Sequence, residues 1–102
     1  MIIHATLVRV DPPGSAQPGD PIVVRSALTS LTRSDLDWLA VNGLSATAAV
    51  YVPLGAQTPD IEAGAVIAVQ QDGLSTTEWI AVHAADYVGV VSRYRKVYVT
   101  PA

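Results

Sequence analysis

The chain has 102 residues, of which 50% are hydrophobic and 15% are charged, and its formal net charge is −3. This length suits one domain, and the negative charge argues against a general nucleic-acid binder, which needs basic surface to meet phosphate. Cysteine is absent, which excludes disulfides, zinc–thiolate sites and a thiol nucleophile. Because the sequence has neither the pattern of a signal peptide nor an apolar run of about 20 residues, we expect a soluble protein.

The first half of the chain is expected to contain two strands and two long loops. Residues 2–10 and 22–25 are apolar and β-branched, which favours strands. Residues 11–21 hold four Pro and two Gly and are predicted to form a loop. Residues 26–46 are predicted to form a second extended loop. Within it we expect either a short helix, capped by Ser34 and ended by Asn42-Gly43, or an irregular segment held by Trp38.

The second half alternates between strands and turns. Strands are predicted over 47–54, 65–71, 77–83 and 92–100, with 84–91 as a loop or a further short strand. Asp72-Gly73 is a strong hairpin signal, and residues 59–64 are predicted to turn. Short strands separated by turn residues are typical of a small barrel or sandwich, so we predict a mostly β fold in a single domain.

The sequence predicts no catalytic site. His4 and His83 are the only histidines, and each lies in a predicted strand. The G-x-S-x-G pattern of a serine nucleophile is absent, and the glycines are scattered and form no phosphate-binding loop. A histidine packed at a sheet edge is the favoured interpretation, and we expect no enzyme activity and no cofactor.

Two pairs of acids have the spacing of cation ligands or of an acid and a base. Asp35 and Asp37 form one pair, and Asp60 and Glu62 form the other. Neither pair follows the calcium-loop pattern, and no third acid lies nearby in the sequence. We therefore expect these four side chains to be solvated loop acids and no metal to be bound.

The basic and aromatic residues that stand out are expected to serve packing or an interface. Arg93, Arg95 and Lys96 form the only basic cluster, which is either a contact for DNA or acidic neighbours or, as favoured here, a charged and solvated edge strand. Alternation places Arg93 and Arg95 on the strand face that also carries Val97 and Val99. Trp79 is expected in the core, and Trp38 in the core or an interface.

Three motifs follow one another in a recurring order. They are V-Y-V-P at residues 50–53, D-I-x-A-G at residues 60–64 and D-G at residues 72–73, followed by the alternating strand at 92–100. In this order and spacing, residues 31–101 resemble the head-closure, or stopper, proteins of long-tailed, siphovirus-like phages, especially the small versions from phages of actinobacteria. The chain departs from that pattern at Ala65, where the family often has Asp, and at Trp79, where a Tyr-x-Val strand is common.

The resemblance implies an SH3-like or related small β barrel that assembles as a homo-oligomeric ring in the virion. Such a ring lies below the portal and adaptor, docks the tail, and lets DNA pass without sequence-specific binding. Before assembly the subunit is in the host cytoplasm, with no membrane involved. No catalytic residue, cofactor or metal is implied. The residues expected at an interface or in the channel are Asp35, Asp37, Trp38, Asp60, Glu62, Arg93 and Arg95. Asp35 and Asp37 are expected to repel DNA from a channel loop.

Two other interpretations remain open at the level of sequence. The chain could be another ring component of the same particle, such as an adaptor or a tail terminator. It could also be a cellular β-barrel module that binds peptides or nucleic acid, although its aromatic residues are spread over several strands and do not form one row for base stacking.

Overall fold

The computed structural model describes residues 4–11, 22–55, 61–71 and 75–102. These residues form six strands and a helix, which is α1 (Arg33–Val41). The strands are β1 (His4–Asp11), β2 (Ile22–Ser30), β3 (Ala48–Pro53), β4 (Val66–Gln71), β5 (Thr77–Val88) and β6 (Arg93–Pro101). The predicted mostly β fold is therefore confirmed. None of the described helical residues belongs to a helix long and apolar enough to cross a membrane.

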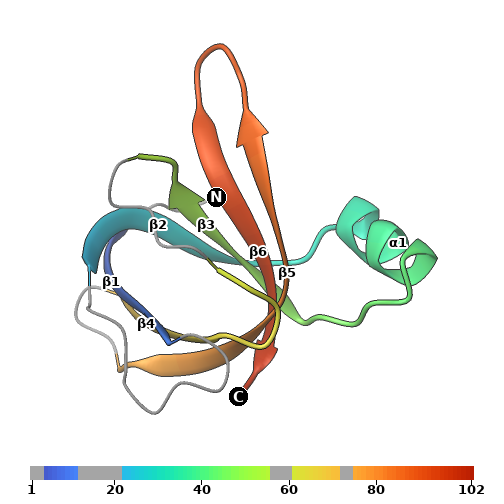
Figure 1. The fold of residues 1–102 in the computed structure, drawn as a ribbon, viewed down its shortest axis with the longest axis horizontal. Helices are drawn as coiled ribbons and strands as arrows, with labels where there is room; N and C mark the ends of the chain where they lie inside the picture. Colours follow the sequence, from blue (N-terminus) through green and yellow to red (C-terminus); the bar gives the residue numbers. More distant parts are fainter. Residues whose placement is uncertain (1–3, 12–21, 56–60, 72–74) are drawn as a thin grey trace.

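The six strands close into a barrel in the order β1-β2-β3-β6-β5-β4, and β4 pairs with β1 to complete it. Every neighbouring pair is antiparallel, and Figure 1 shows the strands curling around a common interior. Closure gives each strand a hydrogen-bonding neighbour on both sides, which removes open sheet edges along the paired lengths. The expected small barrel is confirmed.

Successive side chains of β3 and β6 point alternately into the barrel and out of it. Val50 and Val52 of β3 and Val97 and Val99 of β6 point inward and are fully buried. They form the interior core together with Ala48, Ala65, Ile67, Val69 and Ala81. Leu28, Ile61, Trp79 and Ala84 pack against it while half-buried. The predicted face of Val97 and Val99 is thus the barrel interior, and Trp79 lies at the edge of that core.

A second, smaller core lies on the outside of the barrel, where α1 covers the wall. Leu39 of α1 packs on Ala49 of β3 and Tyr98 of β6, and all three are buried. Half-buried side chains from the segments around the helix complete this outer core: Leu31, Leu44, Ala46, Tyr51 and Val82. Both faces of β3 and β6 are therefore buried, which makes these two strands the centre of the molecule.

Local sequence signals set both ends of α1. Thr32, and not Ser34 as predicted, is the N-cap: its hydroxyl accepts from the Asp35 N–H at 3.2 Å, and Asp35 Oδ2 accepts from the Thr32 N–H at 3.0 Å. This reciprocal capping box satisfies two N–H groups that the first turn leaves unpaired. The predicted stop at Asn42-Gly43 is confirmed, because Gly43 has φ +68° and donates to the Ala40 carbonyl.

The extended loop predicted over residues 26–46 is wrong at residues 26–30, which belong to β2, while the short helix expected there as one alternative is present as α1. β2 continues to Ser30 because residues 27–30 pair with β3, and α1 then occupies most of the remainder. The first predicted loop largely coincides with residues 12–21, which lie outside the described residues, while Asp11 belongs to β1.

β5 and β6 form a hairpin that extends beyond the barrel (Figure 1). β5 runs to Val88, not to His83 as predicted, because its pairing with β6 continues to Val88↔Arg93. Its pairing with β4 covers only Thr77 to Ile80, so β5 from Ala81 to Val88 has no strand partner in β4. A bulge between Ala81 and His83 shifts the register where the hairpin leaves the wall.

Candidate functional site

The residues singled out in the sequence separate into two places on the structure. Asp35, Asp37 and Trp38 lie on α1, whereas Arg93 lies beside the turn of the β5–β6 hairpin and Arg95 lies two residues further along β6. Glu62 lies in the segment before β4, beside Arg95 and the start of the hairpin. Asp60 lies outside the described residues. The candidate site therefore has two parts, a helix and a hairpin, joined by β6.

Asp35 anchors the helix to the barrel. Its carboxylate accepts a hydrogen bond from the ammonium of Lys96 and another, at 3.0 Å, from the hydroxyl of Tyr98. The same carboxylate caps the helix through Thr32, so every oxygen of this buried acid has a donor. The Lys96 ammonium also lies 5.4 Å from the ring centre of Tyr51 and 5.0 Å from that of Tyr98, within the range of cation–π attraction.

The charges of this network are held over a wide pH range. Burial alone raises the pKa of Asp35, but the hydrogen bonds from Lys96, Thr32 and Tyr98 outweigh it and lower that pKa to about 2. Burial lowers the pKa of Lys96, and its hydrogen bond to Asp35 outweighs this and raises that pKa above its usual value. Burial, and then the bond to Asp35, raises the pKa of Tyr98. Between about pH 4 and pH 10 all three groups keep one protonation state.

The burial of Asp35 and Lys96 corrects two expectations. Asp35 is only 7% exposed and is paired, so in this subunit it is not a solvated acid that repels DNA from a loop. Lys96 is buried because β6 lies between β3 and β5 and is not a charged edge strand. Asp37 does match the expectation of a surface acid: its side chain is 70% exposed and lies 3.6 Å from Arg33.

An aromatic stack supports the helix from the side. Trp38 of α1 lies nearly parallel to Tyr98 of β6, with ring centres 5.4 Å apart, and contacts His83 of β5 at 5.0 Å. His83 is thus half-buried among aromatic rings, which agrees with a packing role. Trp38 nevertheless keeps 40% of its surface exposed, so one side of the ring holds the helix in place and the other side faces solvent.

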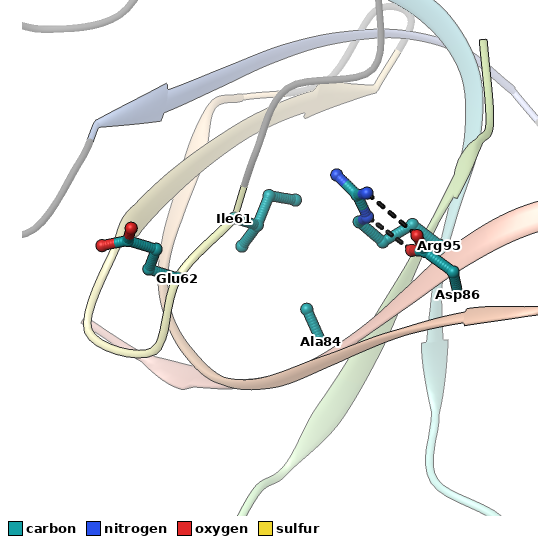
Figure 2. A pocket seen from close by; sticks show the side chains of 5 residues that line it. All are labelled: Ile61, Glu62, Ala84, Asp86 and Arg95. Atoms are coloured by element: carbon teal, nitrogen blue, oxygen red, sulfur yellow. Dashed lines mark hydrogen bonds and ion pairs between the residues drawn. The ribbon is translucent and has the colours of Figure 1, made fainter.

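Arg95 braces the hairpin at its base. Its guanidinium donates two hydrogen bonds to Asp86 across the hairpin, at 2.6 and 3.0 Å. This bidentate pair keeps both side chains in one geometry. The pair borders a hollow of about 420 Å³ lined by Ile61, Glu62, Ala84, Asp86 and Arg95. Figure 2 shows the Arg95 guanidinium directed toward Ile61, whereas the Glu62 carboxylate points away from the guanidinium.

Aromatic pairs and a tight turn hold the outer part of the hairpin. Tyr87 stacks on Tyr94 across the two strands, with ring centres 5.2 Å apart, and Tyr94 contacts Tyr51 of β3 at 5.4 Å. At the turn the N–H of Gly89 donates to the carbonyl of Ser92 at 2.9 Å. Cross-strand contacts of this kind stabilise a hairpin that has few other neighbours.

Large exposed apolar side chains gather at two places only, among the described residues. We define the helix patch as Leu36, Trp38 and Val41 of α1, and the hairpin tip as Tyr87, Val88, Val90 and Val91. Among residues 28–55, 61–70 and 75–102, these seven are the large hydrophobic side chains that are exposed. Exposed apolar clusters of this kind mark interaction sites more often than scattered single residues do. The sequence analysis found Trp38 but missed the hairpin tip, although the run from 87 to 91 lacks any charged residue.

The arrangement is suited to binding through apolar contact. No three His, Asp or Glu side chains of residues 4–11, 22–55, 61–71 and 75–102 come together as a metal site would require. Comparison of the chain with protein-family models, with curated proteins and with solved structures finds no match.

Proposed function

We propose that the chain is a structural subunit of the neck of a long-tailed phage, where it forms the head-closure ring. In this role it seals the DNA channel below the portal and adaptor and docks the tail. The observation that carries the proposal is the placement of the helix patch and the hairpin tip on two separate extensions of one small barrel. A ring subunit must contact one neighbour through one surface and the next neighbour through a different surface.

The construction of the two extensions supports an assembly role. The helix is held by the buried Asp35–Lys96 pair, and the hairpin by the Asp86–Arg95 pair, so both patches have fixed positions before any partner binds. Preorganised surfaces bind with a smaller entropic cost than surfaces that order on binding. A stable barrel with two rigid apolar extensions is therefore well suited to forming a particle from repeated copies.

The resemblance of residues 31–101 to head-closure proteins, in the order of their motifs, supports the choice of the neck over other positions in the particle. Of the residues expected at an interface, Asp37, Trp38 and Arg93 lie beside or within the two patches. Asp35 and Arg95 are not part of either patch. Each is paired inside the molecule and holds one extension in position.

The test is electron microscopy of particles from a phage that carries an amber stop codon in this gene. In a host that does not suppress the codon, we expect filled or leaking heads beside separate, complete tails. A suppressor host is the matched control and restores joined particles. Normal tailed particles in the non-suppressing host would contradict the neck role and would favour a cellular β-barrel binding module.

A further inference from the structure

We infer that the hairpin tip of one copy docks on the helix patch of a second copy of this chain, in a head-to-tail contact. The inference rests on the proposed ring function and adds to it the two surfaces that meet. A contact between two different patches is heterologous, and its repetition about an axis closes a ring. The patches, their charges and their rigidity each support this choice of partner.

The two patches are unusually apolar for solvent-exposed surface. Val90 and Val91 of the hairpin tip are 105% and 97% exposed, and Val41 of the helix patch is 86% exposed. The helix turns a buried acid, Asp35, toward the barrel and an apolar residue, Val41, toward solvent. Leu39 also faces the barrel, as in an ordinary amphipathic helix, but the solvent side of α1 is apolar at Val41, where a polar residue is usual. A partner that covers Val41 would remove the anomaly.

The charges beside the two patches are complementary. Arg93 is the only charged residue from Tyr87 to Tyr94, it is exposed, and it pairs in register with Val88, so the hairpin tip is positive. Asp37 is exposed one turn before Val41 and pairs at 3.6 Å with Arg33, which is itself 90% exposed and lies in the first turn, whereas the last turn of α1 has no basic residue. The carbonyls of Trp38, Leu39 and Ala40 accept hydrogen bonds from the capping residues, so this end of α1 offers a partner the Asp37 carboxylate and no cation. Arg93 of one copy suits this acidic end of the next, whereas two tips facing each other would bring two arginines together.

Geometry favours a contact between copies over a contact within one. The hairpin tip stands at one end of the barrel, and α1 lies on its outer wall away from that tip (Figure 1). Each is fixed to β6, the tip through Arg95 and the helix through Lys96 and Tyr98. A patch that cannot reach its complement in the same molecule remains available to the complement on another copy.

Engineered disulfides test the contact directly, because the natural chain has no cysteine. Val41→Cys and Val90→Cys each change an exposed side chain, and both variants are expected to fold as the parent does, which circular dichroism checks. The two purified variants are mixed at high concentration and oxidised. We expect a disulfide-linked dimer from the mixture at a yield at least about fivefold above either variant alone. A Val41→Cys, Val90→Cys double variant is expected to give a ladder of higher oligomers.

Three results would overturn the inference. One is the absence of a mixed dimer. Another is a Val90→Cys homodimer that forms as readily as the mixed one, which would indicate a symmetric contact between tips. The last is an equal yield of mixed dimer when the Val41→Cys copy is oxidised with a Ser75→Cys copy in place of the Val90→Cys copy. Ser75 is an exposed control position away from both patches.

Charge reversal gives a second, independent readout. Arg93→Asp is introduced into the Val90→Cys copy, or Asp37→Arg into the Val41→Cys copy. Either reversal is expected to lower the yield of the mixed disulfide-linked dimer about threefold. Combining the two reversals is expected to restore it. Loss that is not restored would mean that Arg93 and Asp37 do not face each other, and the inferred pairing would be wrong.

The outcomes separate this inference from the proposed function. If the amber phage yields heads without tails but the mixed dimer is absent, the neck role stands and the contact between copies is wrong. If the mixed dimer forms but the amber phage assembles normally, the contact stands and the neck role is wrong.

Discussion

Asp35 serves two parts of the molecule with one carboxylate. One oxygen caps the first turn of α1 through Thr32, and the other accepts from Lys96 and Tyr98 of β6. A buried ion pair of this kind contributes little net stability compared with apolar residues, but removal of one partner leaves the other charge buried and unpaired. The pair therefore specifies where the helix docks more than it stabilises the barrel.

Asp35→Asn is expected to lower the free energy of unfolding by about 3 kcal/mol, because it leaves the buried Lys96 ammonium without a counter-charge. Urea unfolding followed by tryptophan fluorescence measures this change, since Trp38 stacks beside the network. The matched control is Asp37→Asn, which alters an exposed acid and is expected to cost less than about 0.5 kcal/mol. Equal effects of the two variants would contradict the anchoring role of Asp35.

The same carboxylate makes stability depend on pH in the acid range. The pKa of Asp35 falls from 3.8 to about 2 on folding, so the folded state binds fewer protons between these values. Its contribution is fully present above about pH 4 and is lost as the pH falls through about 2. The difference corresponds to about 2 kcal/mol. Urea midpoints from pH 6 to pH 2 should fall more steeply for the parent than for Asp35→Asn, and parallel curves would contradict this assignment.

At the level of elements, the C-terminal end of α1 and the inward face of β6 could be predicted from local sequence, whereas the N-cap was expected at Ser34 and lies at Thr32. The Asn42-Gly43 stop and the inward face of Val97 and Val99 follow from backbone conformation and from period-two alternation. The length of β2 could not, because residues 27–30 become a strand only through pairing with β3. Long-range pairing of this kind has no local signature.

The helix end offers a test of backbone conformation alone. Gly43 has φ +68°, and an added Cβ would meet no atom within 4 Å. Gly43→Ala is therefore expected to cost about 1 kcal/mol through conformational strain without any steric clash. Gly55→Ala is the matched control, since its Cβ also meets open space but its backbone lies outside the left-handed region. Thermal unfolding compares the two, and an equal loss would contradict this explanation.

Across the whole molecule, the sequence predicted the class of fold but only part of the candidate site. Short strands with turn residues between them indicated a small barrel. Pairing of β1 with β4 closes this barrel, and valines fill its interior. The contact between Asp35 and Lys96 joins residues 61 positions apart, which no spacing rule detects. The hairpin tip was missed because residues 84–91 were predicted only as a loop or short strand, and the exposure of an apolar run depends on which strands flank it.

The position of β6 has a mechanical consequence. Arg95 and Lys96 are adjacent residues, and they hold the two extensions from opposite faces of the strand. A force applied to the hairpin therefore reaches the helix across one peptide bond, in a strand that is paired with β3 on one side and β5 on the other. The helix also contacts β3 through Ala49 and β5 through His83, so these three strands together hold the angle between the two extensions. In any assembly that uses both extensions, the curvature, and with it the width of the opening, depends on the twist of this part of the sheet.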